Sequence, residues 1–120
     1  MVSEISSGLV VQDSKILMVF DEKSGKWDVP SDSRSSGELS ADAAARAVES
    51  VTSSDCEVAR YRKRLKTVFE SSGEERVWQP YTVEISGSPE NGEWIPLTDL
   101  GSRDLAEPLA AVKDKLMDRL

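Results

Sequence analysis

The fold of this chain is decided by residues 36–55, SGELSADAAARAVESVTSSD, where a Gly-Glu pair leads into an Ala-rich segment. Ser40 stands before the segment and Asp42 follows in its first turn, a pattern typical of a helix whose N-cap is Ser40. Apolar residues then recur at steps of four and three, as in a helix with one buried face. The members of this expected buried stripe are Ala44, Val48 and Val51. We expect the helix to end near residues 53–55, a polar Ser-Ser-Asp cluster.

The residues before this helix predict a hairpin and a loop. Residues 8–12 and 15–20 are apolar and β-branched runs separated by Asp13 and Ser14, a pair that favours a tight turn between antiparallel strands. Residues 31–40 are rich in Ser, Asp and Gly. A segment of this composition predicts an exposed loop.

After the helix the sequence predicts two further strands. Residues 58–69 alternate between apolar and basic side chains, which is the period-2 pattern of a half-buried strand. A turn at residues 71–73 returns the chain into a second strand at residues 77–85. Pro80 in that strand implies an edge position or a bulge, because proline has no backbone N–H to donate.

The chain ends in a second expected helix. A loop at residues 87–92 precedes the segment 94–100, WIPLTDL, and residues 104–120 follow. Apolar side chains recur in this last segment at three- and four-residue steps, which indicates an amphipathic helix. They are Leu105, Leu109, Val112, Leu116 and Leu120. Strands with interspersed helices over 120 residues indicate a single layered domain of the α/β or α+β class, spanning residues 1–120.

Composition opposes several classes of function. The net charge of -7 disfavours attraction to duplex nucleic acid or to an anionic membrane. No apolar run approaches the roughly 18 residues that a membrane-spanning helix needs. Cys56 is the only cysteine and histidine is absent, so no internal disulfide forms and the commonest zinc ligand is missing. The first residues lack the order of a secretory signal, and we expect a cytoplasmic protein.

The order of these parts resembles the Nudix (MutT-like) hydrolase superfamily. The resemblance covers essentially the whole chain: a GLVV hairpin, the motif KWDVP at residues 26–30, the Gly-Glu pair, an Ala-rich helix that carries an arginine, and EWIPLTDL at residues 93–100 before a terminal helix. It implies an α/β/α sandwich in which a mixed sheet is flanked by helices.

The Nudix signature runs glycine, five residues, glutamate, seven residues, then Arg-Glu-apolar-x-Glu-Glu-x-Gly-apolar. This sequence aligns with it without a gap: Asp32 falls on the first glycine, Glu38 on the first glutamate, Arg46 on the arginine and Ser53 on the closing glycine. The positions of the three helix glutamates are occupied by Ala47, Ser50 and Val51. The resemblance therefore predicts a degenerate Nudix box.

Nudix enzymes cleave a diphosphate linked to another moiety, with Mg²⁺ or Mn²⁺ held by the helix carboxylates. A hard divalent cation needs oxygen ligands, and from the matched set this helix offers only Ser50. We therefore expect a non-catalytic or very weak protein, without a cofactor, that binds a nucleotide-like ligand or a protein partner. In MutT-like members an Asn before Glu-Pro reads the base, and Ala106 stands there in this chain.

The alternative is a relocated metal site in an atypical divalent-metal-dependent hydrolase. Its catalytic residues would be Glu38, Arg46 and Glu49. Its Mg²⁺ or Mn²⁺ ligands would come from the Ser31 carbonyl, Glu38, Glu90 and Glu93. A simpler interpretation places Glu49 with Asp42 and Arg46 in an exposed salt-bridging trio.

Two further features are candidates for ligand binding. Arg60, Arg62 and Arg64 project from one face of an expected strand, where three guanidinium groups would clamp phosphate oxygens or simply form a solvated basic face. Trp78 lies out of phase with its apolar neighbours and would either stack on a base or pack in the interior. Exposed strands also leave a homodimer open as an alternative.

Overall fold

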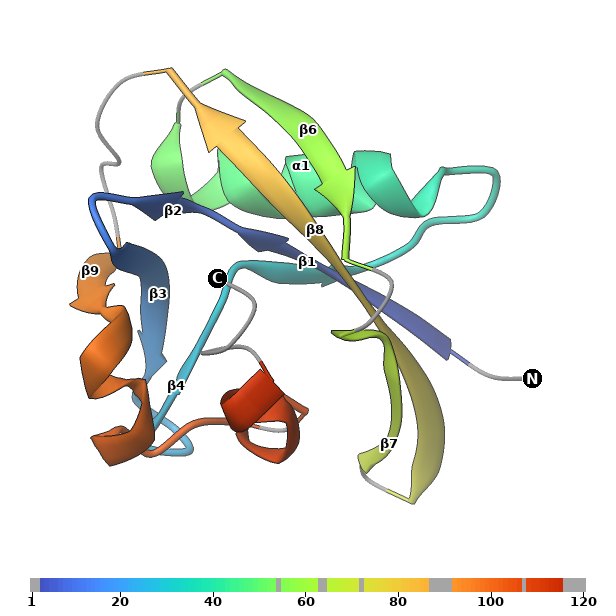
Figure 1. The fold of residues 1–120 in the computed structure, drawn as a ribbon. Coiled ribbons are helices and arrows are strands. Elements are labelled where there is room, and N and C mark those ends of the chain that lie inside the picture. The colour runs from blue at the N-terminus through green and yellow to red at the C-terminus, as the bar shows by residue number, and fades with distance from the viewer. Residues whose placement is uncertain are drawn as a thin grey trace.

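The computed structural model describes residues 3–53, 55–62, 65–71, 73–86, 92–106 and 108–115, and Figure 1 shows the arrangement of their strands and helices. Its first sheet has the order β5-β1-β8-β6, and β7 pairs with β8 beside β6. The strands of this sheet are β1 (Ser3–Leu9), β5 (Ser31–Ser33), β6 (Cys56–Tyr61), β7 (Thr67–Ser71) and β8 (Glu74–Ile85). Because β8 is parallel to β1 and antiparallel to β6 and β7, the sheet is mixed.

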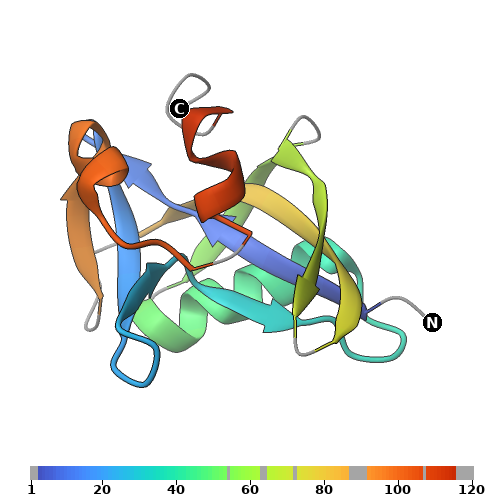
Figure 2. The same cartoon turned by 90° about the horizontal axis from the view of Figure 1, so that it is seen from below.

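The second sheet has the order β2-β3-β4, and β9 pairs with β3. Its strands are β2 (Val11–Gln12), β3 (Lys15–Asp21), β4 (Lys26–Asp28) and β9 (Glu93–Pro96). The expected hairpin is confirmed, since Gln12 pairs with Lys15 across the turn. Asp13 and Ser14 take φ values of 51° and 62°, as a two-residue type I′ turn requires. Figure 2 shows the blue β3 beside the orange β9 at one end of the molecule.

The helix α1 (Ser40–Thr52) lies across the first sheet and approaches β1 closely. A Cβ built on Gly8 would collide with the Val48 side chain and lie 3.4 Å from the Ala44 carbonyl oxygen, so glycine is what allows this approach. Ala44 and Val48 are fully buried as expected, but Val51 is only partly buried. The buried face of α1 is Ala43, Ala44, Ala47, Val48 and Thr52.

The two ends of α1 differ from expectation in one respect. The N-cap position is held by Leu39, with no side-chain cap bond, and Ser40 is already helical. The prediction that Ser40 is the cap is therefore wrong by one position, the usual scale of uncertainty at a helix end. The helix stops where expected, because Ser53 takes a left-handed conformation with φ 54° and donates its N–H to the Glu49 carbonyl at 2.8 Å.

Hydrophobic side chains form a cluster on each side of the first sheet. The cluster on the α1 side is built on Val10, Leu17, Val48 and Val83. The other includes Leu9, Ile16, Met18, Trp78, Leu100, Leu105 and Leu109. Successive side chains of β3 point to opposite faces, so Leu17 enters one cluster while Ile16 and Met18 enter the other.

Residues 58–69 do not form one strand. The segment is divided between β6 and β7, which pair with different parts of β8, and the register shifts between Val58 and Arg60 as at a bulge. Leu65, between the two strands, is buried. The period-2 pattern predicted which side chains turn inward there, but not the break in backbone pairing.

Pro80 lies in the central strand β8, so the prediction that it marks an edge strand or bulge is wrong. β7 pairs with β8 up to Trp78, and β6 pairs with it from Tyr81 onward. The Pro80 carbonyl accepts the Arg62 N–H at 2.9 Å, on the side where the two short strands leave a gap. The missing N–H of proline therefore removes no ladder bond there.

Two other segments also depart from expectation. Residues 31–40 contain β5, which pairs antiparallel with β1, so this segment is only partly loop. The predicted helix at 104–120 is wrong over its first turns, because Asp104 and Ala106 hydrogen-bond to the backbone of Trp27. The helical turns are η2 (Leu97–Ser102) and η3 (Ala110–Val112). Leu105, Leu109 and Val112 are buried as predicted, and Leu116 and Leu120 lie outside the described residues.

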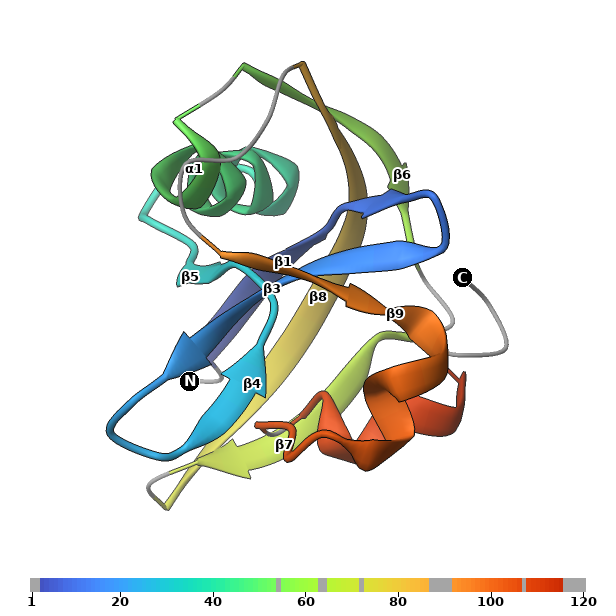
Figure 3. The ribbon, with the colours of Figure 1, turned by 90° about the vertical axis from the view of Figure 1, so that its left-hand side faces the viewer.

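Figure 3 shows α1 on one side of the sheets and the helical turns of the C-terminal part on the other. The predicted fold class, a mixed sheet flanked by helical elements, is confirmed. Within the described residues, no helix is both long enough and apolar enough to cross a membrane.

Candidate functional site

A cleft of about 290 Å³ lies between α1 and the strands β3, β4 and β5. Its residues are Val19, Phe20, Asp21, Asp28, Val29, Pro30, Ser31, Asp32, Ala47, Ser50 and Val51. The volume is close to the lower end of small-molecule sites, roughly 300 Å³. The walls are apolar with a few polar groups, which is the usual character of such sites.

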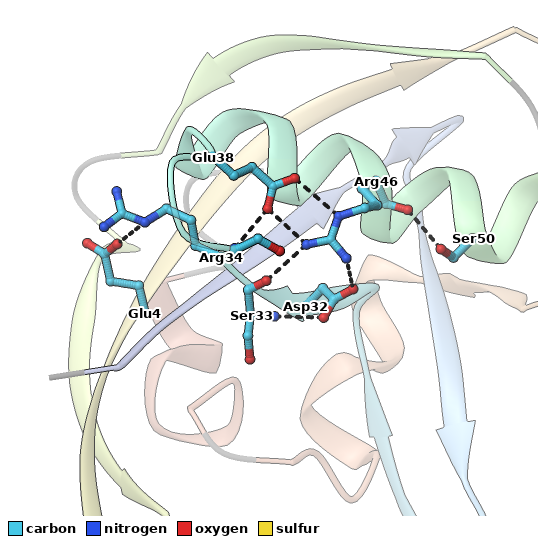
Figure 4. Close-up of polar contacts among 8 residues, drawn as sticks. Glu4, Asp32, Ser33, Arg34, Glu38, Arg46 and Ser50 are labelled. Atoms are coloured by element: carbon cyan, nitrogen blue, oxygen red, sulfur yellow. Dashed lines mark hydrogen bonds and ion pairs between the residues drawn. The ribbon is translucent and has the colours of Figure 1, made fainter.

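One wall of the cleft is the side of α1 that carries Ala47, Ser50 and Val51. These are the positions that align with the three helix glutamates of the Nudix signature. Ser50 is the polar member, and its hydroxyl donates to the Arg46 carbonyl at 3.0 Å (Figure 4). A serine hydroxyl that bonds back to its own helix carries no charge with which to hold a divalent cation.

The opposite wall carries three aspartates, Asp21, Asp28 and Asp32. The pKa of Asp28 is raised from 3.8 to about 6, chiefly by burial; the Val29 N–H acts to lower it and the nearby charge of Asp21 acts to raise it. That N–H donates to Oδ1 of Asp28 at 2.8 Å. The other oxygen of Asp28 has no hydrogen bond within the described residues.

Arg46 joins α1 to the segment that leads into it. Its guanidinium binds Asp32 Oδ2 at 2.6 Å, both carboxylate oxygens of Glu38 at 2.9 and 3.2 Å, and the Ser33 carbonyl at 3.0 Å (Figure 4). Glu38 in turn accepts the Ser35 N–H at 3.0 Å. Arg46 lowers the pKa of Glu38, with help from the Ser35 N–H. This network fixes the loop onto the helix and leaves Glu38 engaged as a partner of Arg46.

Glu49 lies apart from this network, although the relocated-site hypothesis joined it to Glu38. Its carboxylate accepts a weak hydrogen bond from the Cys56 thiol at 3.5 Å. Burial, followed by the charge and hydrogen bond of Glu49, raises the pKa of Cys56 to about 11. Glu49 does not line the cleft, because one step along α1 turns a side chain by about 100° from 3.6 residues per turn. The structure does not bring Glu49 and Glu38 together in this cleft, and their joint catalytic role stays a prediction.

The other expected metal ligands are described only in part, so their assembly stays a prediction. Ser31 lies in the cleft wall, Glu93 is exposed on β9 and does not line the cleft, and Glu90 lies outside the described residues. Across the described ranges, no three His, Cys, Asp or Glu side chains come together as a site for a metal ion. The side chains that the structure places here do not fit the divalent cation of the Nudix mechanism.

Ser31 connects the cleft wall to the core. Its hydroxyl donates to the Val29 carbonyl at 2.9 Å and shares a 2.6 Å hydrogen bond with the Ser7 hydroxyl. Trp78 Nε1 donates to Ser7 at 2.6 Å. Because each hydroxyl has one proton, the donors run from Trp78 through Ser7 and Ser31 to Val29. Trp78 is only 1% exposed, so the packing interpretation holds and its ring does not stack on a ligand.

The expected arginine clamp lies partly outside the described residues. Arg60 is exposed on β6 and Arg62 follows that strand, while Arg64 is not described. Neither Arg60 nor Arg62 lines the cleft. A phosphate clamp of three guanidinium groups stays a prediction.

Sequence reasoning missed the acidic wall and the aromatic residue at its edge. Asp28 lies inside the motif KWDVP, where an ionisable side chain between apolar residues is a signal of a perturbed site. Phe20 is 47% exposed at the end of β3, although it closes an apolar run in the sequence. No local pattern indicates that Asp28 lines a cleft beside α1 or that the Phe20 ring packs on Trp27.

No protein-family model matches this chain, and no curated protein matches it either. Solved structures match in fold. The NUDIX hydrolase from Nitrosomonas europaea superposes with a TM-score of 0.80 at 14% identity, over 96% of this chain and 87% of that one. The E. coli ORF135 protein gives 0.82 at 16% identity, over 98% and 89%. The MutT NUDIX hydrolase from Burkholderia pseudomallei gives 0.74 at 21% identity, over 100% and 98%. The chain therefore has the Nudix fold.

Proposed function

We propose that this chain is a Nudix-fold binding protein with a degenerate Nudix box, and that it does not hydrolyse its ligand by the metal-dependent mechanism. The observation that carries the proposal is the side of α1 in the cleft, where Ala47, Ser50 and Val51 offer no carboxylate. Without such ligands a phosphate-bound Mg²⁺ or Mn²⁺ is not held against the helix. No divalent metal is part of the proposed function.

The ligand site of the proposal is the cleft itself. A nucleotide-like small molecule and a protein partner are the ligand classes that the sequence suggested, and the fold shared with the NUDIX hydrolases supports the first. A small molecule suits the volume of about 290 Å³ better than a protein surface does. A cytoplasmic location without a disulfide fits the single Cys56.

The test measures hydrolysis and metal binding in the same preparation. Nucleoside triphosphates, nucleotide sugars, ADP-ribose and dinucleoside polyphosphates are incubated with Mg²⁺ or Mn²⁺, and product release is followed for the parent, Glu38→Gln and Glu49→Gln. Electron paramagnetic resonance reports bound Mn²⁺. We expect no metal-dependent turnover and no Mn²⁺ bound at the cleft.

A triple variant with Ala47→Glu, Ser50→Glu and Val51→Glu is the matched positive control, because it places carboxylates on the cleft side of the same helix. We expect this variant to bind Mn²⁺ more tightly than the parent. Metal-dependent turnover by the parent that disappears in Glu38→Gln would show an atypical hydrolase and overturn the proposal.

A further inference from the structure

We propose that the edge of the first sheet at the junction of β6 and β7 binds single-stranded nucleic acid, with phosphates on Arg60 and Lys66 and a base stacked on Tyr61. This surface is separate from the cleft, since none of these three residues lines the cleft. The proposal therefore goes beyond the proposed function and does not depend on it. It rests on an acid-free basic segment and a tyrosine ring that meet at one sheet edge.

Basic residues are concentrated in one segment of an acidic chain. Residues 58–69 contain five of the 15 Lys and Arg residues and none of the 22 Asp and Glu residues, so the rest of the chain carries a net charge of -12. Positions 63 and 64 lie outside the described residues, whereas Arg60, Arg62 and Lys66 are described. A local concentration of positive charge attracts a polyanion within a Debye length, about 8 Å at physiological salt, even when the net charge of the protein is negative.

The structure places this segment at the outer edge of the first sheet. β6 and β7 pair with successive parts of β8, on the side of β8 away from β1 (Figure 1). Arg60 and Lys66 are exposed there, and neither side chain forms an ion pair within the described residues. Both cations are therefore available to an external anion.

The two cations are spaced along the edge. Arg60 pairs with Thr82, and Thr67, the residue after Lys66, pairs with Trp78. These partners are four residues apart along β8, which corresponds to roughly 14 Å at 3.4 Å per residue. A strand of a few nucleotides that runs along the edge spans this distance, with one phosphate near each cation.

Tyr61 supplies an aromatic surface next to Arg60. Its ring packs against that of Tyr81 across the strand pair, with centroids 4.9 Å apart. β6 is the outermost strand at this part of the sheet, so no strand of the described chain covers the other flank of the Tyr61 ring. Successive side chains point to opposite faces, and at an edge strand a ligand reaches both Arg60 and Tyr61. Stacking of a base on such a ring adds affinity for every kind of base.

The acid that acts on Tyr61 already has partners within the chain. Arg34 binds the Glu4 carboxylate at 2.7 Å, and Gln79 donates to its other oxygen at 2.7 Å. Burial, followed by the electrostatic effects of Tyr81 and Glu4, raises the pKa of Tyr61. The Tyr61 phenol is therefore uncharged at neutral pH and does not repel a phosphate group.

The tyrosine ring favours a single strand over other polyanions. The bases of a duplex are stacked on one another, and an acidic peptide offers carboxylates without aromatic faces. A single strand presents both phosphates for the cations and unpaired bases for the ring. The other polyanions serve as controls in the test.

The test measures fluorescence anisotropy of labelled strands of about 12 nucleotides, a length within the site sizes of single-strand binding, added to the intact protein at about 50 mM salt. The probes are oligouridylate, oligothymidylate, an abasic strand of the same length and a glutamate peptide of the same charge. We expect Kd values of about 10 to 100 µM for the two strands that carry bases. The abasic strand and the peptide should bind about fivefold more weakly or less.

The same titrations separate the sources of the strand and define failure. Tighter binding of oligouridylate than of oligothymidylate would assign the strand to RNA, and the reverse order would assign it to DNA. Equal binding of oligouridylate and the glutamate peptide would show general attraction to acidic molecules and overturn the proposal. A Kd above about 1 mM for both strands, weaker than ordinary non-specific binding, would also overturn it.

Three variants and one control assign the binding to this edge. Arg60→Gln and Lys66→Gln should each reduce the slope of log Kd against log salt by about 0.7, as expected for one lost phosphate contact on a single strand. Tyr61→Leu should weaken oligouridylate binding about fivefold and leave the abasic strand unchanged. Lys23→Gln removes the same charge from an exposed position between β3 and β4 and should change nothing. An equal effect of Lys23→Gln and Lys66→Gln would contradict a site at this edge.

NMR separates this proposal from the proposed function. Oligouridylate should shift the backbone amides of residues 59–62 and 65–68 and leave those of residues 47–51 in the cleft unchanged. Shifts confined to residues 47–51 would place the strand in the cleft and overturn this inference, while supporting a nucleotide-like ligand there. Metal-dependent turnover would overturn the proposed function, whatever the anisotropy shows.

Discussion

The two faces of α1 contrast sharply. The inward face packs against β1 so closely that only glycine fits opposite Val48. The face toward the cleft presents Ala47, Ser50 and Val51 to an open space bounded by aspartates. The first face stabilises the fold, whereas the second forms one wall of the cleft that we propose as the ligand site. The comparison teaches that the close packing of α1 on β1 and the Arg46 network are kept in this chain although the aligned glutamate positions hold Ala47, Ser50 and Val51.

The largest effect is expected on the inward face. Gly8→Ala places a Cβ against Val48 and 3.3 Å from Val83 Cγ2, and overpacking of this kind costs about 3 kcal/mol of unfolding free energy, at the upper end of the usual range. Gly101→Ala is the control, because nothing lies within 4 Å of its added Cβ. Urea denaturation of both variants measures the difference. An unchanged midpoint for Gly8→Ala would show that α1 can move away from β1 freely.

Substitution of Asp28 in the cleft wall is expected to stabilise the protein at high pH, whereas Gly8→Ala destabilises it. The pKa of Asp28 is raised from 3.8 to about 6 in the folded state, so the folded protein binds the extra proton between these pH values. Stability from this group is therefore highest near pH 4, falls as pH rises to about 6 and stays lower above that. Asp28→Asn should raise the unfolding free energy by about 2 kcal/mol at pH 8 and change it little at pH 4.

Denaturant titrations at the two pH values check this sign, with the exposed Glu84→Gln as the control. A variant Asp28→Asn that is less stable than the parent at pH 8 would mean that the charged carboxylate supports the fold. In that case Asp28 would stabilise the fold, as the inward face of α1 does.

A third prediction concerns Ser53, whose backbone conformation ends α1. Ser53 takes φ 54°, a left-handed conformation that glycine adopts without a steric penalty. Ser53→Gly should raise the unfolding free energy by about 1 kcal/mol. Thermal unfolding of Ser53→Gly beside Ser102→Gly, which lies at an exposed position with no positive φ, separates this gain from a general effect of glycine. Destabilisation by Ser53→Gly would contradict the assignment of this conformation.

The smallest effect on global stability is expected from the loop before α1. Arg46→Lys removes the bidentate hold on Glu38 and the contact with the Ser33 carbonyl, because a lysine presents a single ammonium. Amide hydrogen exchange of residues 34–38 should accelerate while that of β1, β6, β7 and β8 stays unchanged.

The parent itself should show the same loosening in acid. Arg46 depresses the pKa of Glu38, so the ordering is present above the normal pKa of a glutamate and is lost as pH falls through the depressed value. Equal exchange rates for parent and Arg46→Lys at neutral pH would show that Arg46 does not order the loop.

Much of the fold was predictable because its signals are local. The Asp13-Ser14 turn, the helix stop at Ser53 and the inward side of β7 follow from turn chemistry and periodicity over a few residues. The break between β6 and β7 was not predictable, because it depends on which part of β8 each strand pairs with. The buried leucines near the C-terminus were identified correctly, but burial alone does not tell helix from extended chain, and Leu105 forms a bridge with Trp27.

The features of the candidate site likewise divide into those that the sequence predicted and those that depend on tertiary contacts. The sequence by itself determined the Nudix order of parts, the alignment of Glu38 and Arg46 with the first glutamate and the arginine of the signature, and the lack of a glutamate at aligned positions 47, 50 and 51, since these depend on residue identity and spacing. Only the tertiary structure decided that Asp28 lines the cleft beside α1, that the Phe20 ring packs on Trp27, that Glu49 lies apart with Cys56, and that Trp78 is buried. Strand pairing and helix packing bring distant residues together, and no spacing within a segment encodes those distances.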